Sequence, residues 1–209
     1  MKYKLVIFDF DGTLADSFPW LLGSFDQVAR KFQITPLGTE QIDTLRGYSP
    51  RELMARMRIP VWKLPLVAQH VRTLMAQSRD EIKLFGGVEH VLEGLAERRI
   101  DTALLTSNSL ENVRHILTEP NFSRFRYGEF GLSPLGKHAG FRSLLKKSGV
   151  KPSEALYVGD TLTDAEAARA AGIVFVGVAW GYATAAALQP VSLRVLSKGF
   201  DELLELVGQ

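Results

Sequence analysis

Four short apolar runs, spread along the chain, constrain most strongly what this sequence can fold into. They are Leu5-Val6-Ile7-Phe8 and three later runs at residues 102–105, 155–158 and 174–178. An uninterrupted run of this length is typical of a strand buried on both faces of a parallel sheet. Helical patterns separate or follow the runs, at residues 87–98, 110–117, 139–147, 163–171 and 200–207. Strands that alternate with helices predict an α/β fold with a doubly wound, mainly parallel sheet.

Residues 15–82 break this alternation. The segment has helical patterns at 18–32, 50–57 and 61–82 and no convincing strand, and several Pro and Gly residues separate the pieces. We interpret it as an all-helical cap domain inserted just after the first strand.

The insertion divides the chain into two predicted domains. Residues 1–14 and 83–209 form the α/β core, and residues 15–82 form the helical cap. Gly12 lies near the entry to the cap and Gly86-Gly87 near its exit, so these glycines are candidate hinges.

Charge and composition exclude several classes of partner. The net charge is only +2, with no polybasic tract, so neither nucleic acid nor a membrane surface is an expected partner. No stretch approaches the roughly 20 apolar residues that span a bilayer. The absence of cysteine excludes a disulfide and a thiolate metal site. We expect a soluble, cytoplasmic protein, either a monomer or a homodimer.

Two carboxylates follow the first apolar run directly, in Asp9-Phe10-Asp11-Gly12. Residues i and i+2 of an extended strand point to the same side, and two close carboxylates repel each other unless a cation lies beside them. An oxygen-rich site of this kind suits Mg²⁺. Alone, the pattern is equally consistent with a capping Asp followed by an Asp-Gly turn.

Polar residues also follow two later runs. Thr106-Ser107-Asn108-Ser109 offers hydroxyls and amides for an anion site, or a plain helix N-cap. Asp160 and Asp164 are one helical turn apart and can face one site, although Asp164 also suits a helix N-terminus. Ligands of open α/β sheets bind beyond the carboxyl ends of the strands, so three such ends together indicate a single site.

The order of these motifs resembles the haloacid dehalogenase-like superfamily of phosphotransferases. The opening nine residues from Asp9 are very close to its first motif, Thr106 falls at the second, and Lys137 at the third, although His138 follows where Pro is usual. Gly159-Asp160-Thr161-Leu162-Thr163-Asp164 matches the fourth motif. The segment from Gly159 to Gly172 and the position of the helical insert resemble the phosphoglycolate phosphatase-like branch.

This resemblance implies a Mg²⁺-dependent phosphatase that acts on a small phosphate monoester. Asp9 would be the nucleophile that forms an aspartyl-phosphate, and Asp11 the general acid and base. Mg²⁺ would be held by Asp9, the main-chain carbonyl of Asp11, and Asp160, with Asp164 orienting water or Lys137. The phosphate- and substrate-binding residues implied or suggested are Gly12, Thr106, Ser107, Asn108, Lys137 and, from the cap, Arg46.

Other residues and other functions are weaker expectations. Ser107 competes with Thr106 for the second motif. Arg51, Arg56 and Arg72 are less distinctive than Arg46 as cap residues that contact substrate, and Trp20 and Trp62 suit a core better than a ligand platform.

A haloacid dehalogenase would lack the acid at Asp11, whereas a sugar-phosphate phosphomutase would share the whole catalytic set. Phosphonate hydrolysis would need a cap lysine such as Lys31 or Lys63. A non-catalytic, phosphate-binding regulatory protein is the alternative from a different class.

Overall fold

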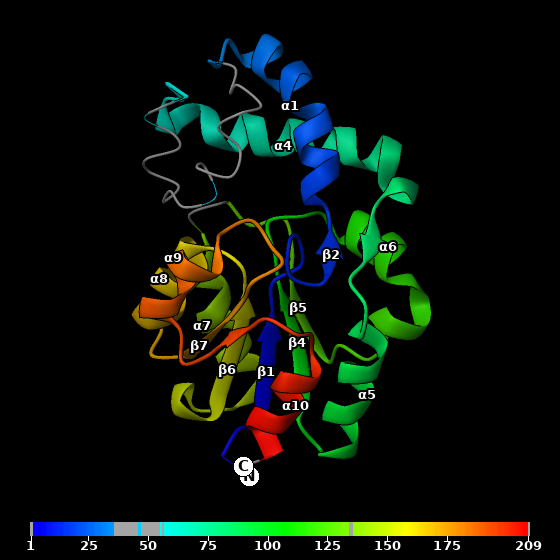
Figure 1. Cartoon of the computed structure of the whole chain (residues 1–209), viewed down its shortest axis with the longest axis vertical. Coiled ribbons are helices and arrows are strands. Elements are labelled where there is room, and N and C mark those ends of the chain that lie inside the picture. The colour runs from blue at the N-terminus through cyan, green and yellow to red at the C-terminus, as the bar shows by residue number, and fades with distance from the viewer. Residues whose placement is uncertain (1, 36–45, 47–54, 56, 134–135, 209) are drawn as a thin grey trace.

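The computed structural model describes residues 2–35, 46, 55, 57–133 and 136–208 (Figure 1). Within these residues, six strands form one sheet in the order β5-β4-β1-β6-β7-β8, and every neighbouring pair is parallel. The strands are β1 (Leu5–Phe8), β4 (Asp101–Leu105), β5 (Tyr127–Glu129), β6 (Ala155–Gly159), β7 (Val174–Val178) and β8 (Val195–Leu196). The predicted α/β fold with a parallel sheet is confirmed.

Helices cover both faces of this sheet because successive strand residues point to opposite sides. Val6 and Phe8 pack into one hydrophobic cluster and Leu5 and Ile7 into another. The first cluster includes residues of α5 (Val88–Glu97), α6 (Leu110–Phe122) and α10 (Asp201–Gly208). The second includes residues of α7 (Lys137–Ser148), α8 (Leu162–Ala170) and α9 (Ala185–Leu188). All four residues of β1 are therefore buried, as their continuous apolar run predicts.

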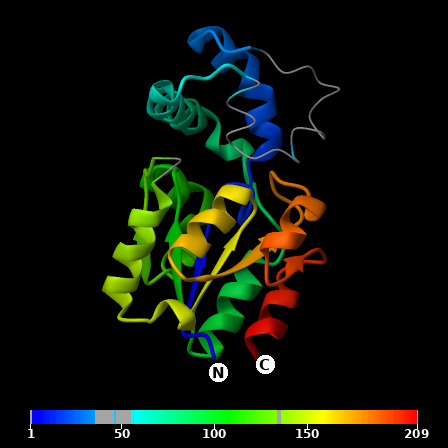
Figure 2. The ribbon, with the colours of Figure 1, turned by 90° about the vertical axis from the view of Figure 1, so that its left-hand side faces the viewer.

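Two longer helices, α1 (Phe18–Phe32) and α4 (Leu64–Ser78), lie above the carboxyl ends of the strands in both views (Figures 1 and 2). The short 3₁₀ turns η2 (Val61–Lys63) and η3 (Arg79–Glu81) flank α4. A small hydrophobic cluster joins the two helices, and it consists of Val28, Ala29, Ile34, Met57 and Leu74. Most of the helix predicted at 50–57 lies outside the described residues.

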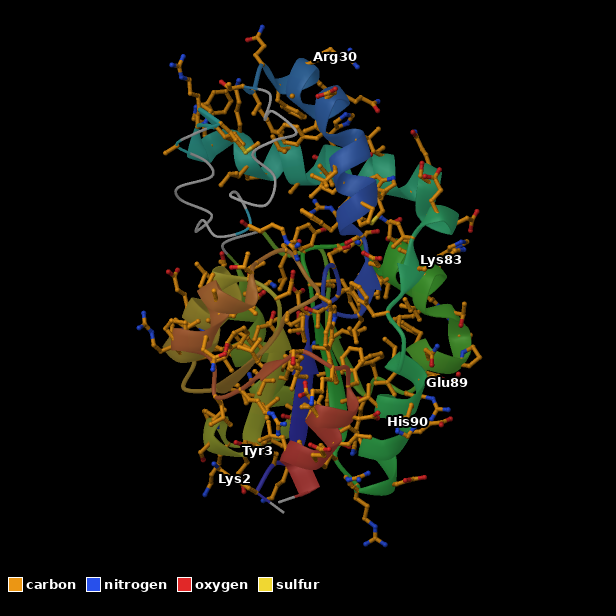
Figure 3. All side chains as sticks on the ribbon, viewed as in Figure 1. Lys2, Tyr3, Arg30, Lys83, Glu89 and His90 are labelled. Carbon is orange, nitrogen blue, oxygen red and sulfur yellow. The ribbon has the colours of Figure 1, made fainter. Side chains whose placement is uncertain are left out.

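The chain enters and leaves this helical layer through a two-stranded ribbon. β2 (Ala15–Asp16) pairs antiparallel with β3 (Lys83–Leu84), and the Phe85 amide donates a hydrogen bond to the Leu14 carbonyl at 2.9 Å. The expectation of no strand in residues 15–82 is therefore wrong at its first two residues, because a two-residue strand has too few positions to show a pattern. Lys83, labelled in Figure 3, marks the junction between the two layers.

Two helix boundaries and two edge strands also differ from the sequence expectations. α7 begins at Lys137 rather than at residue 139, and α6 continues past a break at Thr118 (φ 61°) to include Pro120. Two edge strands, β5 and β8, were not expected, because each is too short to form an apolar run. The remaining 3₁₀ turns are η4 (Pro152–Glu154) and η5 (Gln189–Val191).

Among the helices of the described ranges, none is both long enough and apolar enough to cross a membrane.

Candidate active site

The parallel sheet brings the predicted motifs to one edge. β1 lies between β4 and β6, so Asp9, Thr106 and Asp160 follow three adjacent strands at their carboxyl ends. All three residues are buried. The convergence arises from strand order, because β1, β4 and β6 are far apart in the sequence.

Lys137 connects two of the carboxylates. Its Nζ lies 2.6 Å from Asp9 Oδ2 and 2.5 Å from Asp164 Oδ1, and donates a third hydrogen bond to the Tyr157 hydroxyl at 3.0 Å. Lys137 is the first residue of α7, where the helix dipole opposes a cation. The two carboxylates compensate for this position.

Burial and charge shift the pKa values of this cluster in different directions. Burial raises the pKa of Asp9 to about 7, although the Lys137 ammonium beside it acts in the opposite direction. Burial would lower the pKa of Lys137, but the carboxylates of Asp164 and Asp9 outweigh it, so that pKa is raised. Burial would raise the pKa of Asp164, but Lys137 and hydrogen bonds lower it. The lysine therefore stays charged, and Asp164 is its firmest counter-ion.

Asp164 is saturated with hydrogen-bond donors. Its Oδ1 accepts from Lys137 and from the Tyr157 hydroxyl at 2.8 Å, and its Oδ2 accepts from the Thr161 amide and hydroxyl at 2.9 and 2.6 Å. Thr161 is also the N-cap of α8, with Asp164 as the third residue of a capping box. Asp164 therefore caps α8, as one of the two sequence interpretations predicts, and it also contacts Lys137.

Asp160 is fully buried and held from two sides. Its Oδ1 accepts from the Thr13 hydroxyl at 3.1 Å, and its Oδ2 accepts from the Tyr182 amide at 2.7 Å. Burial, and then repulsion from Asp164 and Asp9, raise the pKa of Asp160 well above its ordinary value. A buried carboxylate among other carboxylates is stabilised in its charged form by a cation.

Gly12 allows this close packing. A Cβ at Gly12 would lie 2.2 Å from Asp160 Oδ2 and 2.4 Å from the Tyr182 ring, and its φ of +75° is one that side chains rarely adopt. Gly12 was predicted to bind substrate and to act as a hinge. Both of these roles stay predictions, and the structure shows that Gly12 leaves room for Asp160.

Three of these carboxylates form a group that suits a metal ion. Asp9, Asp160 and Asp164 each offer one oxygen, and these oxygens lie within 4.8 Å of one another. Carboxylate oxygens are the donors that Mg²⁺ prefers. The four carboxylates of Asp9, Asp11, Asp160 and Asp164 face a single ammonium among the described site residues, so a divalent cation fits the charge as well as the donor chemistry.

Asp11 is not part of this group of three, and it contacts the second motif. Asn108 Nδ2 donates to both Asp11 oxygens, at 3.3 and 3.0 Å. Burial raises the pKa of Asp11, although hydrogen bonds from Ser17 and Asn108 act in the opposite direction. A carboxyl group with a raised pKa keeps its proton to a higher pH than an exposed carboxyl group does.

Thr106 and Ser107 differ in their exposure to the site. The Thr106 hydroxyl is buried and accepts a hydrogen bond from the Asn108 amide at 3.0 Å. Ser107 and Asn108 line a cavity of about 410 Å³, and Asp9, Asp11 and Lys137 line it as well. Thr106 does not line this cavity.

We call the part of this cavity that Asp9, Asp11 and Lys137 line its floor. Helices α1 and α4 form the wall opposite this floor. The wall consists of Trp20, Leu21, Leu64, Val67, Ala68, Val71, Arg72 and Met75. Arg72 was one of the less distinctive arginines in the sequence, yet its Nη1 donates to the Ser107 carbonyl at 2.9 Å. It therefore connects α4 to the loop of the second motif.

Arg46, the cap residue predicted to contact substrate, reaches a different part of the core. Its guanidinium donates to the carbonyls of Gly181 and Tyr182, at 2.5 and 3.3 Å, and lies over the Phe18 ring. It does not line the cavity. Arg46 therefore joins the segment between α1 and α4 to the loop that holds Asp160.

Tyr182 and Tyr157 are site residues that the sequence analysis missed. The Tyr182 hydroxyl lies 2.9 Å from the Ser17 hydroxyl, and its ring packs edge-on against Phe18. Tyr157 lies within the apolar run of β6, so its contacts with Lys137 and Asp164 have no signal in the pattern. The run of aromatic and glycine residues at 180–182 is the one signal that could have indicated Tyr182.

Two other expectations about the cap change. Trp20 lines the cavity as well as packing on the core, and Trp62 is 67% exposed rather than buried. Lys31 contacts His70 and Lys63 contacts the Phe32 carbonyl, and neither lies against the cavity. The phosphonate interpretation therefore loses its candidate lysines.

Comparison with known proteins gives the class. Residues 6–178 match the family model of the haloacid dehalogenase-like hydrolases. A phosphoglycolate phosphatase from Synechococcus elongatus is 31% identical over 207 residues, which cover 99% of this chain and 98% of that protein. Phosphoglycolate phosphatase 1 from Pseudomonas aeruginosa is 28% identical and covers 86% of this chain and 70% of its own length.

Solved structures agree in fold. A haloacid dehalogenase-like hydrolase from Streptococcus pneumoniae superposes with a TM-score of 0.78 at 20% identity, over 98% of this chain and 99% of that one. The chain belongs to the haloacid dehalogenase-like hydrolase family. The predicted resemblance to its phosphoglycolate phosphatase-like branch is confirmed, and so is the prediction of an enzyme of this family with phosphatase relatives.

Proposed function

We propose that this protein is a Mg²⁺-dependent phosphatase that hydrolyses a small phosphate monoester through an aspartyl-phosphate on Asp9. The observation that carries the proposal is the buried Asp9 carboxylate at the floor of the cavity, paired with Lys137 at 2.6 Å and adjacent to Asp11. The phosphatase relatives along nearly the whole chain support it. We also propose that residues 15–82 form a cap domain on a core of residues 1–14 and 83–209.

In the first half of the reaction, a carboxylate oxygen of Asp9 attacks phosphorus and the bond between phosphorus and the ester oxygen breaks. Asp11 donates its proton to the departing oxygen, so the product leaves as an alcohol. The raised pKa of Asp11 supports this role, because an acid must hold its proton at the start of the cycle.

In the second half, Asp11 accepts a proton from water as the water oxygen attacks phosphorus. The bond between Asp9 and phosphorus then breaks, inorganic phosphate departs and the Asp9 carboxylate is regenerated. One residue therefore serves first as acid and then as base, which requires that Asp11 stay in the same place throughout. The two hydrogen bonds from Asn108 support such a fixed position.

The remaining residues hold charge. Asp9, the Asp11 carbonyl and Asp160 would bind Mg²⁺, whose charge would reduce the repulsion between the phosphate and the Asp9 carboxylate. Lys137 and the groups near Ser107, which line the cavity, would contact the equatorial phosphoryl oxygens, where transition-state charge accumulates. Thr106, whose hydroxyl accepts from the Asn108 amide, would support this loop and would reach the phosphoryl group only if the loop moved. Asp164 orients Lys137 through their contact. Helices α1 and α4 would exclude water during the first step.

The test is phosphate release by the purified chain with Mg²⁺, from 2-phosphoglycolate and p-nitrophenyl phosphate. We expect Asp9→Asn to lower kcat by at least about 1000-fold, since removal of a nucleophile costs several orders of magnitude. Asp16→Asn is the matched control, because Asp16 is exposed in β2.

Turnover by Asp9→Asn at the wild-type rate would contradict the assignment of the nucleophile. A wild-type chain that binds phosphate and releases none from either ester would favour the non-catalytic alternative.

A further inference from the structure

The α4 helix presents an apolar stripe to the active-site cavity. Leu64, Val67, Ala68, Val71 and Met75 follow one another at intervals of one, three or four residues, which places them on one face of the helix. Trp20 and Leu21 of α1 extend this surface. Helix α4 lies above the carboxyl ends of the strands (Figures 1 and 2). Its stripe lines the same cavity as Asp9 and Asp11.

These side chains are incompletely packed. Leu21, Leu64, Val67, Ala68 and Val71 are all only half-buried, although they face inward toward the cavity. Apolar surface left in contact with water in a concave site favours binding of an apolar group.

Within the described residues, the wall has little to offer a second negative charge. Arg72 is the single cation of α1 and α4 that lines the cavity, and its Nη1 is already bound to the Ser107 carbonyl. The floor opposite it carries the carboxylates of Asp9 and Asp11 and one ammonium, Lys137, which Asp9 and Asp164 already share. Among the described lining residues, a carboxylate on the leaving group would therefore meet no uncommitted cation from below and an apolar surface above.

We propose that the preferred substrate is a phosphate monoester with an uncharged, apolar leaving group larger than a two-carbon acid, seated against the stripe on α4. The proposal rests on the proposed phosphatase function, because the phosphoryl group must lie at Asp9. The cavity of about 410 Å³ is within the range of sites that enclose whole organic ligands, so it has room for such a group. The leaving group would contact Val67, Val71 and Trp20. Arg72 would keep its hydrogen bond to the Ser107 carbonyl.

The first experiment is a homologous series of unbranched alkyl phosphates, from methyl to butyl phosphate, with 2-phosphoglycolate for comparison. All are primary alkyl esters, so the chemistry of the breaking bond changes little along the series. Each methylene that enters the apolar site should raise kcat/KM by roughly two- to fourfold. We expect butyl phosphate to exceed 2-phosphoglycolate by at least about tenfold.

A charge variant localises the effect. Val71→Lys places an ammonium within the stripe, so it should lower kcat/KM for butyl phosphate and raise it for 2-phosphoglycolate. Gln69→Lys adds the same charge at an exposed position of α4 that does not line the cavity, and it should leave both values within about twofold. Thermal melting checks that both variants fold, and the alkyl series on the wild-type chain decides the question if Val71→Lys does not.

Three results would overturn the proposal: a flat or falling alkyl series, a preference of the wild-type chain for 2-phosphoglycolate, or equal effects of the two lysine variants. Selective loss of 2-phosphoglycolate turnover in Arg72→Ala, in a chain that prefers that ester, would assign Arg72 to the substrate carboxylate instead. If neither the alkyl phosphates nor 2-phosphoglycolate release phosphate with Mg²⁺, the proposed function itself fails. The two failures are therefore distinguishable.

Discussion

The floor and the wall of the cavity are built on opposite principles. The floor consists of buried charged groups, each held by several partners, as Lys137 is by Asp9, Asp164 and Tyr157. Apart from Arg72, the wall consists of apolar side chains on two helices, most of them half-buried, which contact a neighbour without directional bonds. We infer that the proposed reaction depends on side chains that hydrogen bonds hold in fixed positions. Selection of the leaving group would depend on apolar side chains that can be substituted with little loss of stability.

The largest effect that would test this contrast is expected at Lys137. Lys137→Met leaves the Asp9 and Asp164 carboxylates without their shared counter-ion and removes a phosphoryl contact. We expect kcat to fall by about 100- to 1000-fold, measured as phosphate release with Mg²⁺. Lys147→Met is the matched control on the last turn of the same helix, because Lys147 is exposed and pairs only with Glu129 at 2.6 Å. A loss below about threefold in Lys137→Met would mean that the floor tolerates change as the wall does.

Packing at Gly12 gives the next largest effect. Gly12→Ala would force Cβ against Asp160 and Tyr182 in a left-handed backbone conformation, so we expect the free energy of unfolding to fall by about 1–3 kcal/mol, with loss of activity. Gly23→Ala in α1 meets no atom within 4 Å and should instead stabilise the chain by about 0.5–1 kcal/mol. Urea denaturation measures both, and equal signs for the two variants would contradict the distinction between a packed floor and an open wall.

The pH dependence of the floor should be smaller but specific. Because the pKa of Asp9 is about 7 in the folded chain and 3.8 ordinarily, the folded state binds more protons between these values. In EDTA, stability should therefore decrease as pH rises from about 4 to 7 and then level off. Mg²⁺ binds the deprotonated carboxylates, so the increase in Tm on adding MgCl₂ should be larger at pH 8 than at pH 5.

Asp9→Asn should show a smaller decrease in stability between about pH 4 and pH 7 than the wild-type chain, whereas Asp16→Asn should show the wild-type decrease. An increase in Tm that is the same at pH 5 and pH 8 would show that the carboxylates do not titrate in this range.

The smallest effect is expected at Tyr182, where floor and cap meet. Tyr182→Phe removes the hydroxyl that contacts Ser17 and should lower stability by about 1 kcal/mol, with kcat/KM nearly unchanged. Ser17→Ala should cost a similar amount, and the double variant should cost less than the sum of the two. Strict additivity, measured by thermal or urea unfolding, would show that the two hydroxyls do not interact.

The sequence predicted the sheet well because β1, β4, β6 and β7 are buried on both faces and their apolar runs are continuous. It missed β5 and β8 because edge strands of two or three residues carry no pattern. Motif order brought Asp9, Asp11 and Asp160 into one hypothesis, and strand order places Asp9 and Asp160 at the same sheet edge.

Contacts between distant segments were not predictable. Arg72 looked like an ordinary helix-surface arginine, and only the placement of α4 over the second motif gives it a partner at Ser107. Tyr157 looked like a core aromatic because β6 is apolar throughout. In both cases the partner comes from another element, so no local pattern of residues contains the information.

The β2–β3 ribbon has an evolutionary consequence. The chain departs from the sheet layer at Ala15 and returns at Leu84, and these two residues are paired neighbours in the ribbon. The intervening segment is covalently connected to the sheet layer at this one point, so segments of other lengths or shapes can be inserted there while the strand order stays the same. Related proteins can therefore keep the same residues at the strand ends while the inserted segment, and with it the substrate specificity, changes independently.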